Sequence, residues 1–453
     1  MPATIEPPPQ QGGAVGPASV AAIAATETLW RKPALRRFWA LNASHVVIDV
    51  FPIFVTSLML VLEDRLALTA AQIGVLYMLT PIFSGALQPF FAWFTDKYDT
   101  RICAPLGLIL GATCLSAIGL AQNFWQVVVL ITLGVIGTGM YHPIGAALAG
   151  QLGGRALRRG RAWAMALFFA AGMLGQSVGP ILCTRINAAF GLEHLLWLAP
   201  PSIGVGVWLF FMVRRAPHRH DNHREMHAAL PKDEARARWR AVILLTLQNC
   251  LRFIVNIAML VMFNVWAASV ILDNPNRAAS LSGNLAAAMT VGMGVTGLFV
   301  GRMVRPGREK GPLVWLSVWG ALFVALTSVV GYAGVRLAGG AWWGYWPVYV
   351  VTALTALGYG ATIPMSISLA QRLIPGRTGM VSSLMMGLGW SVSALAPLLA
   401  TVFLGGVALK QAPTLPEWRI GVAFGCFAAL LLAAGALAMC MPGDLLRKIA
   451  DER

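Results

Sequence analysis

Residues 124–150 read FWQVVVLITLGVIGTGMYHPIGAALAG, a run of 27 residues without a single Asp, Glu, Lys or Arg. A helix that crosses a lipid bilayer needs about 20 mostly apolar residues, so this stretch is long enough. The strands of a membrane barrel would instead alternate polar and apolar residues over about 10 positions. Because the stretch does not alternate, it predicts a membrane-spanning helix. Its internal Pro143 is compatible with that, since neighbouring helices can satisfy the freed backbone groups.

The composition of the whole chain agrees with this one stretch. Of its 453 residues, 57% are hydrophobic and only 11% are charged, and the mean hydropathy is +0.69. Soluble domains are about a quarter charged, so these values exclude a soluble fold and a disordered chain. The six cysteines are scattered without a Cys-x-x-Cys motif, which argues against a disulfide scaffold and a metal or redox centre. We therefore expect an all-α, polytopic membrane protein without a cofactor.

Eleven further stretches have the same apolar character, and the longest internal polar segment, 214–240, divides the spans six and six. The twelve predicted spans are 39–62, 72–95, 102–121, 124–150, 163–184, 195–213, 241–271, 279–301, 312–335, 343–371, 379–406 and 420–441. The predicted units are a disordered cytoplasmic tail (1–30), two six-helix bundles (31–213 and 241–441), the linker (214–240) and a cytoplasmic tail (442–453). The first 30 residues lack Lys and Arg, so they do not read as a signal peptide.

The basic residues predict the orientation. The two tails and the loops on their side of the predicted spans hold 27 of the 34 Lys and Arg residues, and the opposite loops hold six. Lys and Arg concentrate in cytoplasmic loops, so we expect both termini in the cytoplasm and the protein in the inner membrane of the cell. The net charge of +16 is thus mainly a topology signal. Nucleic-acid binding is a poor alternative, because no basic domain lies outside the predicted spans.

Two short patterns recur in the same order in both halves. The spans 124–150 and 343–371 share Gly-x-Gly-x-x-x-Pro, and each following span has a glycine eight residues before a proline. The matching positions are Gly137, Gly139 and Pro143 with Gly358, Gly360 and Pro364, and Gly172 and Pro180 with Gly389 and Pro397. Such internal similarity indicates duplicated, pseudo-symmetric halves, an arrangement found in transporters that bind substrate between them.

Two motifs resemble signatures of the major facilitator superfamily. The loop after the second span reads Ala92-Trp-Phe-Thr-Asp96-Lys97-Tyr-Asp99-Thr-Arg101, which is similar to the family's Gly-x-x-x-Asp-Arg-x-Gly-Arg-Arg. The resemblance implies that Asp96, Lys97 and Arg101 form a gating latch; a solvated stop-transfer cluster is the alternative. In the fifth span, Gly172, Gly175, Gly179 and Pro180 resemble the antiporter signature of drug exporters, which implies that Gly175, Gly179 and Pro180 act in gating. Here the alternative is close helix packing by small residues.

Further stretches resemble a narrower family, the fosmidomycin resistance proteins. Ser44-His45-Val-Val-Ile48-Asp49 is similar to that family's Ser-His-x-x-Asn-Asp, with Ile48 in place of Asn. Residues 375–382, Pro-Gly-Arg-Thr-Gly-Met-Val-Ser, match its loop before the eleventh span. Tyr141-His142-Pro143 fits its Phe-His-Pro-Glu, but Ile144 replaces the Glu. The resemblance implies a proton-coupled efflux permease.

Four ionisable residues fall inside predicted spans, where charge is costly and thus points to function: His45, Asp49, His142 and Arg252. In the major facilitator fold their spans line the central cavity. His45 and Asp49 lie one helical turn apart on one face and are the predicted proton-coupling pair. Arg252 is suited to an anionic substrate group. The predicted substrate-binding residues are Arg252, His142, Asn42, Tyr141, Asn256 and Tyr359.

Purely structural roles remain open for several of these residues. Asp49 and Arg252 can instead form a static ion pair between the halves, and His142 can be a packing histidine. Four histidines of the linker, His218, His220, His223 and His227, have a spacing that can bind a divalent metal, but a solvated loop is the simpler interpretation. The same loop can lie along lipid headgroups. We assign no metal site from the sequence.

The sequence favours a monomeric secondary transporter that exports a small anionic or drug-like compound in exchange for protons. An importer or facilitator of an endogenous organic anion is the alternative within the class. An enzyme is disfavoured, because Ser44 and His45 are adjacent on one helix and cannot face each other as nucleophile and base. No phosphate-binding loop motif is present, which argues against transport driven by ATP. A receptor or scaffold without transport activity also remains open.

Overall fold

A computed structural model describes residues 17–98, 101–157, 160–216, 231–360, 362–374, 377, 380–381 and 384–451. These residues are helical almost throughout and contain no strand. Eleven helices are long and apolar enough to cross a membrane, and a pair bent by 44°, Leu384–Ser393 with Ala396–Phe403, makes twelve if it counts as one span. The predicted all-α fold with twelve spans is confirmed.

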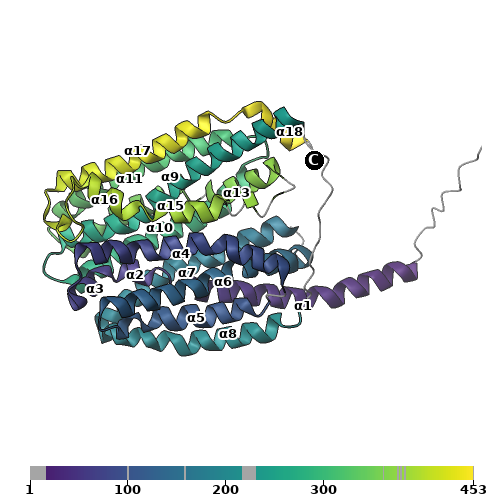
Figure 1. Ribbon diagram of the computed structural model, residues 1–453, viewed down its shortest axis with the longest axis horizontal. Coiled ribbons are helices and arrows are strands. Elements are labelled where there is room, and N and C mark those ends of the chain that lie inside the picture. Colours follow the sequence, from purple (N-terminus) through teal and green to yellow (C-terminus); the bar gives the residue numbers. More distant parts are fainter. Residues whose placement is uncertain are drawn as a thin grey trace, which may run out of the picture.

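The helices form two bundles that lie side by side (Figure 1). The first bundle contains α1 (Pro17–Asp49), α2 (Phe54–Ser57), α3 (Met59–Leu66), α4 (Ala70–Lys97), α5 (Cys103–Ser116), η1 (Ala117–Leu120), α6 (Phe124–Ala156), α7 (Gly160–Phe190), η2 (Leu192–Leu198) and α8 (Ala199–Val213). The second contains α9 (Lys232–Val270), α10 (Pro275–Met303), α11 (Lys310–Leu337), η3 (Trp342–Tyr345), α12 (Trp346–Thr355), η4 (Ala356–Gly358), α13 (Thr362–Leu373), η6 (Leu384–Leu388), α15 (Gly389–Ser393), α16 (Ala396–Phe403), η7 (Ala412–Thr414), α17 (Glu417–Met439) and α18 (Gly443–Asp451).

Three predicted spans are interrupted rather than continuous. In the first predicted span, the regular helix ends at Asp49 and resumes as α2 and α3. Pro52 lacks the backbone N–H that would continue the helical hydrogen bonds. The span 343–371 consists of α12, η4 and α13. The span 379–406 contains η6, a π-helix, where Asn249 Nδ2 donates to the Met385 carbonyl at 2.6 Å. Breaks of this kind often mark functional regions.

The ends of two predicted polar segments are helical. Helix α1 begins at Pro17, inside the tail expected to be disordered up to residue 30, because an alanine-rich run favours the helix. Helix α9 begins at Lys232, within the predicted linker, and Asp233 and Glu234 in its first turn suit the positive helix N-terminus. Residues 1–16 and 217–230, including the four linker histidines, lie outside the described part of the chain.

Glycines of the internal repeat hold equivalent helix crossings. A Cβ on Gly137 of α6 would lie 2.5 Å from the backbone nitrogen of Gly111 in α5. A Cβ on Gly358 of η4 would lie 2.7 Å from the Cα of Gly320 in α11. Only glycine permits these approaches, so the two halves use the repeated pattern for the same packing. This equivalence supports the pseudo-symmetry that the sequence predicts.

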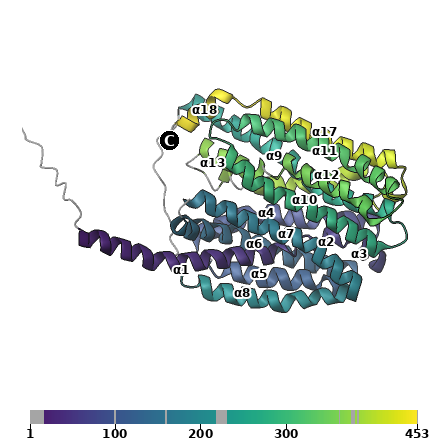
Figure 2. The same ribbon diagram turned by 180° about the vertical axis from the view of Figure 1, so that it is seen from behind.

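The two bundles meet along α7 with α10 and along α4 with α15 and η6. We call the end that carries the start of α1 and α18 the terminal end, and the end that carries α3 the distal end (Figure 2). At the distal end, Asn264 Nδ2 of α9 donates to the Thr56 carbonyl at 2.7 Å and to the Tyr77 hydroxyl at 2.8 Å. Lys410 lies 3.8 Å from Glu63 and donates to the Leu68 carbonyl. Polar contacts therefore join the bundles there.

Candidate functional site

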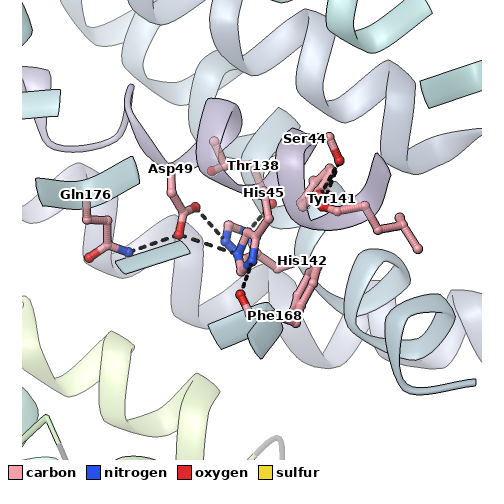
Figure 3. A network of polar contacts seen from close by, with 9 residues as sticks. Ser44, His45, Asp49, Thr138, Tyr141, His142, Phe168 and Gln176 are labelled. Atoms are coloured by element: carbon pink, nitrogen blue, oxygen red, sulfur yellow. Dashed lines mark hydrogen bonds and ion pairs between the residues drawn. The ribbon is translucent and has the colours of Figure 1, made fainter. Parts of the chain in front are cut away.

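The site is built around Asp49, the last residue of α1, whose side chain is almost fully buried. His45 lies one turn earlier on the same helix, as the sequence predicts. Helix α6 brings His142 to the same carboxylate, and α7 brings Gln176 (Figure 3). The structure therefore joins three of the four ionisable residues predicted inside spans, and Arg252 belongs elsewhere.

The contacts to the carboxylate are short and come from two sides. His142 Nε2 lies 2.9 Å from Asp49 Oδ1, and His45 Nε2 lies 3.5 Å from Asp49 Oδ2. Gln176 Nε2 donates to Oδ2 at 3.2 Å. Gln176 was not predicted from the sequence, where its only signal is that it is a polar residue inside the glycine-rich motif of the fifth span. The alternative of a static ion pair between Asp49 and Arg252 is wrong, because, among the described residues, Asp49 contacts only those of the first bundle and Arg252 binds within the second.

The hydrogen bonds of the two histidines fix which ring nitrogens carry protons. His45 Nδ1 lies 2.7 Å from the Phe168 carbonyl, and His142 Nδ1 lies 2.6 Å from the Thr138 carbonyl. A carbonyl oxygen only accepts, so both Nδ1 atoms are donors. In a neutral ring the Nε2 atom then carries a lone pair. Both Nε2 atoms thus direct lone pairs at a carboxylate, and the cluster needs a positive charge or an additional proton to be stable.

Glycines on α7 create the room for this cluster. A Cβ on Gly172 would lie 2.6 Å from Asp49 Oδ2 and 2.8 Å from His45 Nε2. A Cβ on Gly175 would lie 2.2 Å from the Val46 carbonyl, and one on Gly179 would lie 2.3 Å from the Val50 carbonyl. The predicted gating glycines therefore act as the packing surface of α7 on α1, next to the ionisable residues. Pro180 follows in the same helix, and its carbonyl oxygen would lie 3.1 Å from a Cβ on Gly283 of α10.

Tyr141 of α6 holds the part of α1 that carries His45. Its hydroxyl lies 2.7 Å from Ser44 Oγ and donates to the Leu41 carbonyl at 3.0 Å. The Tyr141 side chain is fully buried, and the His45 ring stacks against Phe168 with ring centroids 3.9 Å apart. His142 is the accessible member of the cluster, with 37% of its side chain exposed. Tyr141 thus fixes helix α1 against α6, whereas His142 gives access to the carboxylate.

Arg252 lies fully buried in the second bundle. Its guanidinium donates to the carbonyls of Gly358 and Leu313 and to Ser317 Oγ, at 3.0, 2.7 and 2.7 Å. Its Nη2 also donates to Gln248 Oε1, one turn earlier on α9, at 3.3 Å. These partners come from α9, α11 and η4. Arg252 thus binds the backbone at the interruption of the tenth span. Its neighbour Phe253 packs against Gly389, the repeat position that corresponds to Gly172. In the first bundle, His45 and Asp49 pack against Gly172 instead.

The other predicted substrate-binding residues are buried and bind locally. Asn42 donates to the Phe38 carbonyl of its own helix at 2.8 Å, and its Oδ1 has no partner among the described atoms. Asn256 lies 3.4 Å from Met293 Sδ. The Tyr359 hydroxyl lies 2.8 Å from Thr355 Oγ1. The structure therefore does not gather these three residues with His142 and Asp49 in one network.

The predicted latch is described only in part. The side chains of Asp96 and Lys97 lie outside the described residues, although α4 ends at Lys97. Arg101 donates to the Ala216 carbonyl just beyond α8. In the second bundle, Glu309 and Arg372 form a buried ion pair between the start of α11 and the end of α13. Glu309 was not among the residues predicted from the sequence.

Comparison with protein families gives one match that spans most of the chain. The model of the Major Facilitator Superfamily matches residues 43–397. Among curated relatives, the fosmidomycin resistance protein of Escherichia coli is 26% identical over 79% of this chain and 83% of its own length. An uncharacterised MFS-type transporter of Bacillus subtilis, YfnC, is 22% identical over 88% of this chain and 91% of its own length.

Solved structures show the same fold at low sequence identity. A bacterial homologue of the human lysosomal transporter Spinster, in an inward-facing and unoccupied conformation, has a TM-score of 0.67 and 15% identity, over 92% of this chain and 98% of its own. A bacterial homologue of the human drug peptide transporters PepT1 and PepT2 has a TM-score of 0.64 and 14% identity, over 92% and 99% of the two chains. The likeness extends over both bundles.

Proposed function

Because the chain belongs to the Major Facilitator Superfamily, we propose that it exports a small anionic or drug-like compound in exchange for protons, by alternating access of a site between the two bundles. We further propose that it works as a monomer in the inner membrane, with both termini in the cytoplasm, as the distribution of Lys and Arg favours. The two predicted bundles, 31–213 and 241–441, would be the moving units, joined by the linker 214–240.

One observation carries the proton coupling: the carboxylate of Asp49 faces two imidazole Nε2 atoms. Because both Nδ1 atoms donate to backbone carbonyls, the short His142–Asp49 contact requires an additional proton. A proton shared between His142 and Asp49 is held in a buried site in which the His142 side chain is partly exposed. Loss of that proton leaves lone pairs facing a carboxylate, which favours a rearrangement of α1 against α6. Loading and release of the proton can thereby be linked to movement of the bundles.

The names of the relatives support export of a drug-like compound. The E. coli relative is a fosmidomycin resistance protein. Proteins named multidrug resistance protein MdtG match over about a third of the chain, at 26% identity for one from Enterobacter lignolyticus. We therefore choose fosmidomycin as the first probe. Import of an organic anion is the alternative, and the direction of proton movement in the same assay distinguishes it.

The test is proton flux in liposomes that contain the purified protein and a trapped pH-sensitive dye. We expect fosmidomycin to drive proton movement across the membrane with the wild-type chain. Asp49→Asn should bind the compound but lose at least 90% of the coupled proton flux, because the amide cannot carry the proton. Asp273→Asn, an exposed site, is the matched control and should behave as the wild type. Unchanged coupled flux in Asp49→Asn would rule out Asp49 as the carrier.

A further inference from the structure

We infer that His45, Asp49 and His142 also form a binding site for a divalent transition-metal ion, for which Zn²⁺ is the natural probe. The three residues each offer one ligand atom, and these atoms all lie within 4.8 Å of one another. The inference depends on the donor set and its geometry and holds whether or not transport is coupled to protons. It adds a ligand class that neither the sequence nor the comparisons assign to this chain.

The distances suit a small tetrahedral ion. Zn²⁺ binds histidine nitrogen and carboxylate oxygen at about 2.0–2.2 Å, which places neighbouring ligands about 3.4 Å apart. The two observed separations, His142 Nε2 to Asp49 Oδ1 and His45 Nε2 to Asp49 Oδ2, are 2.9 and 3.5 Å. Small rotations of the side chains would therefore bring all three atoms into the coordination shell. Two histidines with one carboxylate is also a ligand set that Zn²⁺ uses in proteins.

The surroundings orient the two imidazole rings as a metal site requires. A metal-binding histidine usually donates its other ring N–H to a carbonyl or a carboxylate, and this partner fixes the tautomer. Both rings do so here, through Phe168 and Thr138. The Nε2 atoms are thereby held as lone-pair donors aimed at the carboxylate. A divalent cation between them would satisfy the same need for positive charge that a shared proton satisfies.

Burial and access leave one coordination position open. The His45 and Asp49 side chains are 6% and 3% exposed, whereas the His142 side chain is 37% exposed. An ion would enter on the His142 side and keep a water molecule or a ligand atom there as a fourth partner. Because the ion takes the place of the shared proton, its affinity should increase with pH.

The experiment uses the purified full-length protein in detergent and Zn²⁺ alone. The linker histidines His218, His220, His223 and His227 are first replaced by Gln, which removes the second possible metal site and leaves His45, His142 and His194. Zn²⁺ binding is measured by competition with a coloured chelator, and Co²⁺ provides a visible spectrum that reports tetrahedral geometry. We expect one ion per chain, bound more tightly at pH 8 than at pH 6.

Substitutions then place the ion. His142→Gln and Asp49→Asn should each weaken binding at least tenfold, whereas His194→Gln, a distal-end histidine outside the cluster, should leave it unchanged. Each variant is first checked for a monodisperse elution profile and a melting temperature close to that of the background. Undiminished binding in both cluster variants, or no binding of Zn²⁺ at pH 8, would overturn the inference. No gradient or substrate is present, so this result is separate from the outcome for proton coupling.

Discussion

Asp49 illustrates how one buried carboxylate comes to have three partners from three helices. His45 comes from α1, His142 from α6 and Gln176 from α7. A charged group in a membrane interior is expensive unless it is paired, so its partners are part of its function. The glycine at position 172 is equally part of the site, because any side chain there would occupy the space of Asp49 and His45.

At this scale we predict that Gly172→Ala disrupts the cluster. The added methyl group would meet Asp49 Oδ2 at 2.6 Å, so helix α7 or the carboxylate must shift. Such overpacking costs about 1–3 kcal/mol, and we expect a lower melting temperature together with loss of most transport. Gly204→Ala in α8 is the matched control, since a Cβ there meets nothing within 4 Å. Wild-type transport by Gly172→Ala would show that the cluster tolerates displacement.

Among the elements, the tenth span shows how an interrupted helix is stabilised. Between α12 and α13 the regular helix stops, and carbonyls at such an end lose their helical partners. Arg252 of α9 binds the Gly358 carbonyl at the end of η4 and also holds α11 through Leu313 and Ser317. A fully buried guanidinium whose partners are carbonyls, a hydroxyl and an amide oxygen supports the backbone. The geometry therefore favours a structural role for Arg252 over direct substrate contact.

We predict that Arg252→Met destabilises the protein by about 2–4 kcal/mol, because it removes the hydrogen bonds of a buried guanidinium to acceptors of three elements. Thermal unfolding of the purified protein measures this loss. Arg240→Met, an exposed position on the same helix, should leave the melting temperature unchanged. Transport of anionic and neutral compounds should decline to the same extent in Arg252→Met. A stable variant that fails only with anionic compounds would instead assign Arg252 to the substrate.

At the scale of the whole molecule, the contacts of the distal end hold the two bundles together. Asn264 bridges Thr56 and Tyr77, and Lys410 bridges to Glu63 and Leu68. Around them, residues of α3, α4, α9, the start of α10 and residues 409–413 line an open pocket of about 370 Å³. Glu63 is half-buried there, and burial raises its pKa although Lys410 opposes this shift. Opening of the distal end would return Glu63 to water and its pKa toward the ordinary value.

This difference predicts a pH-dependent distal end. Glu63 has the higher pKa in the closed state and binds its proton more tightly there, so low pH favours the closed state. The closed population should therefore fall as the pH rises from the ordinary glutamate pKa of about 4.3 through the raised value. Distances between spin labels at Gln122→Cys and Thr414→Cys, in a chain without other cysteines, report this opening.

Two variants separate Glu63 from its neighbour in that experiment. Glu63→Gln should remove the pH dependence, because an amide does not titrate. Asp64→Asn, at the adjacent exposed acid, should keep it. A label distance that does not change with pH in the wild type, or that still changes in Glu63→Gln, would contradict the role given to Glu63.

The sequence alone predicts several features well, and the reasons are local. Twelve apolar stretches, such as 124–150, predict the spans, because a membrane helix makes all its backbone hydrogen bonds within its own segment. Repeated glycines such as Gly137 and Gly358 predict equivalent crossings, which the structure supports. The family resemblance of the motifs around Asp49 and Asp96 agrees with the match over residues 43–397. His45 and Asp49 lie on one face because the helix repeats every 3.6 residues.

Only the tertiary structure decides which ionisable groups meet. His142 stands 93 residues after Asp49 and Gln176 stands 127 residues after it, and no periodicity within a helix relates them. Their approach depends on glycine contacts between α7 and α1, which sequence spacing does not reveal. The proton positions on His45 and His142 likewise follow from carbonyls of other turns and helices. The sequence by itself thus determined the spans and the helical face of Asp49. Packing between helices determined its partners, because side-chain contacts across a bundle are set by non-local distances.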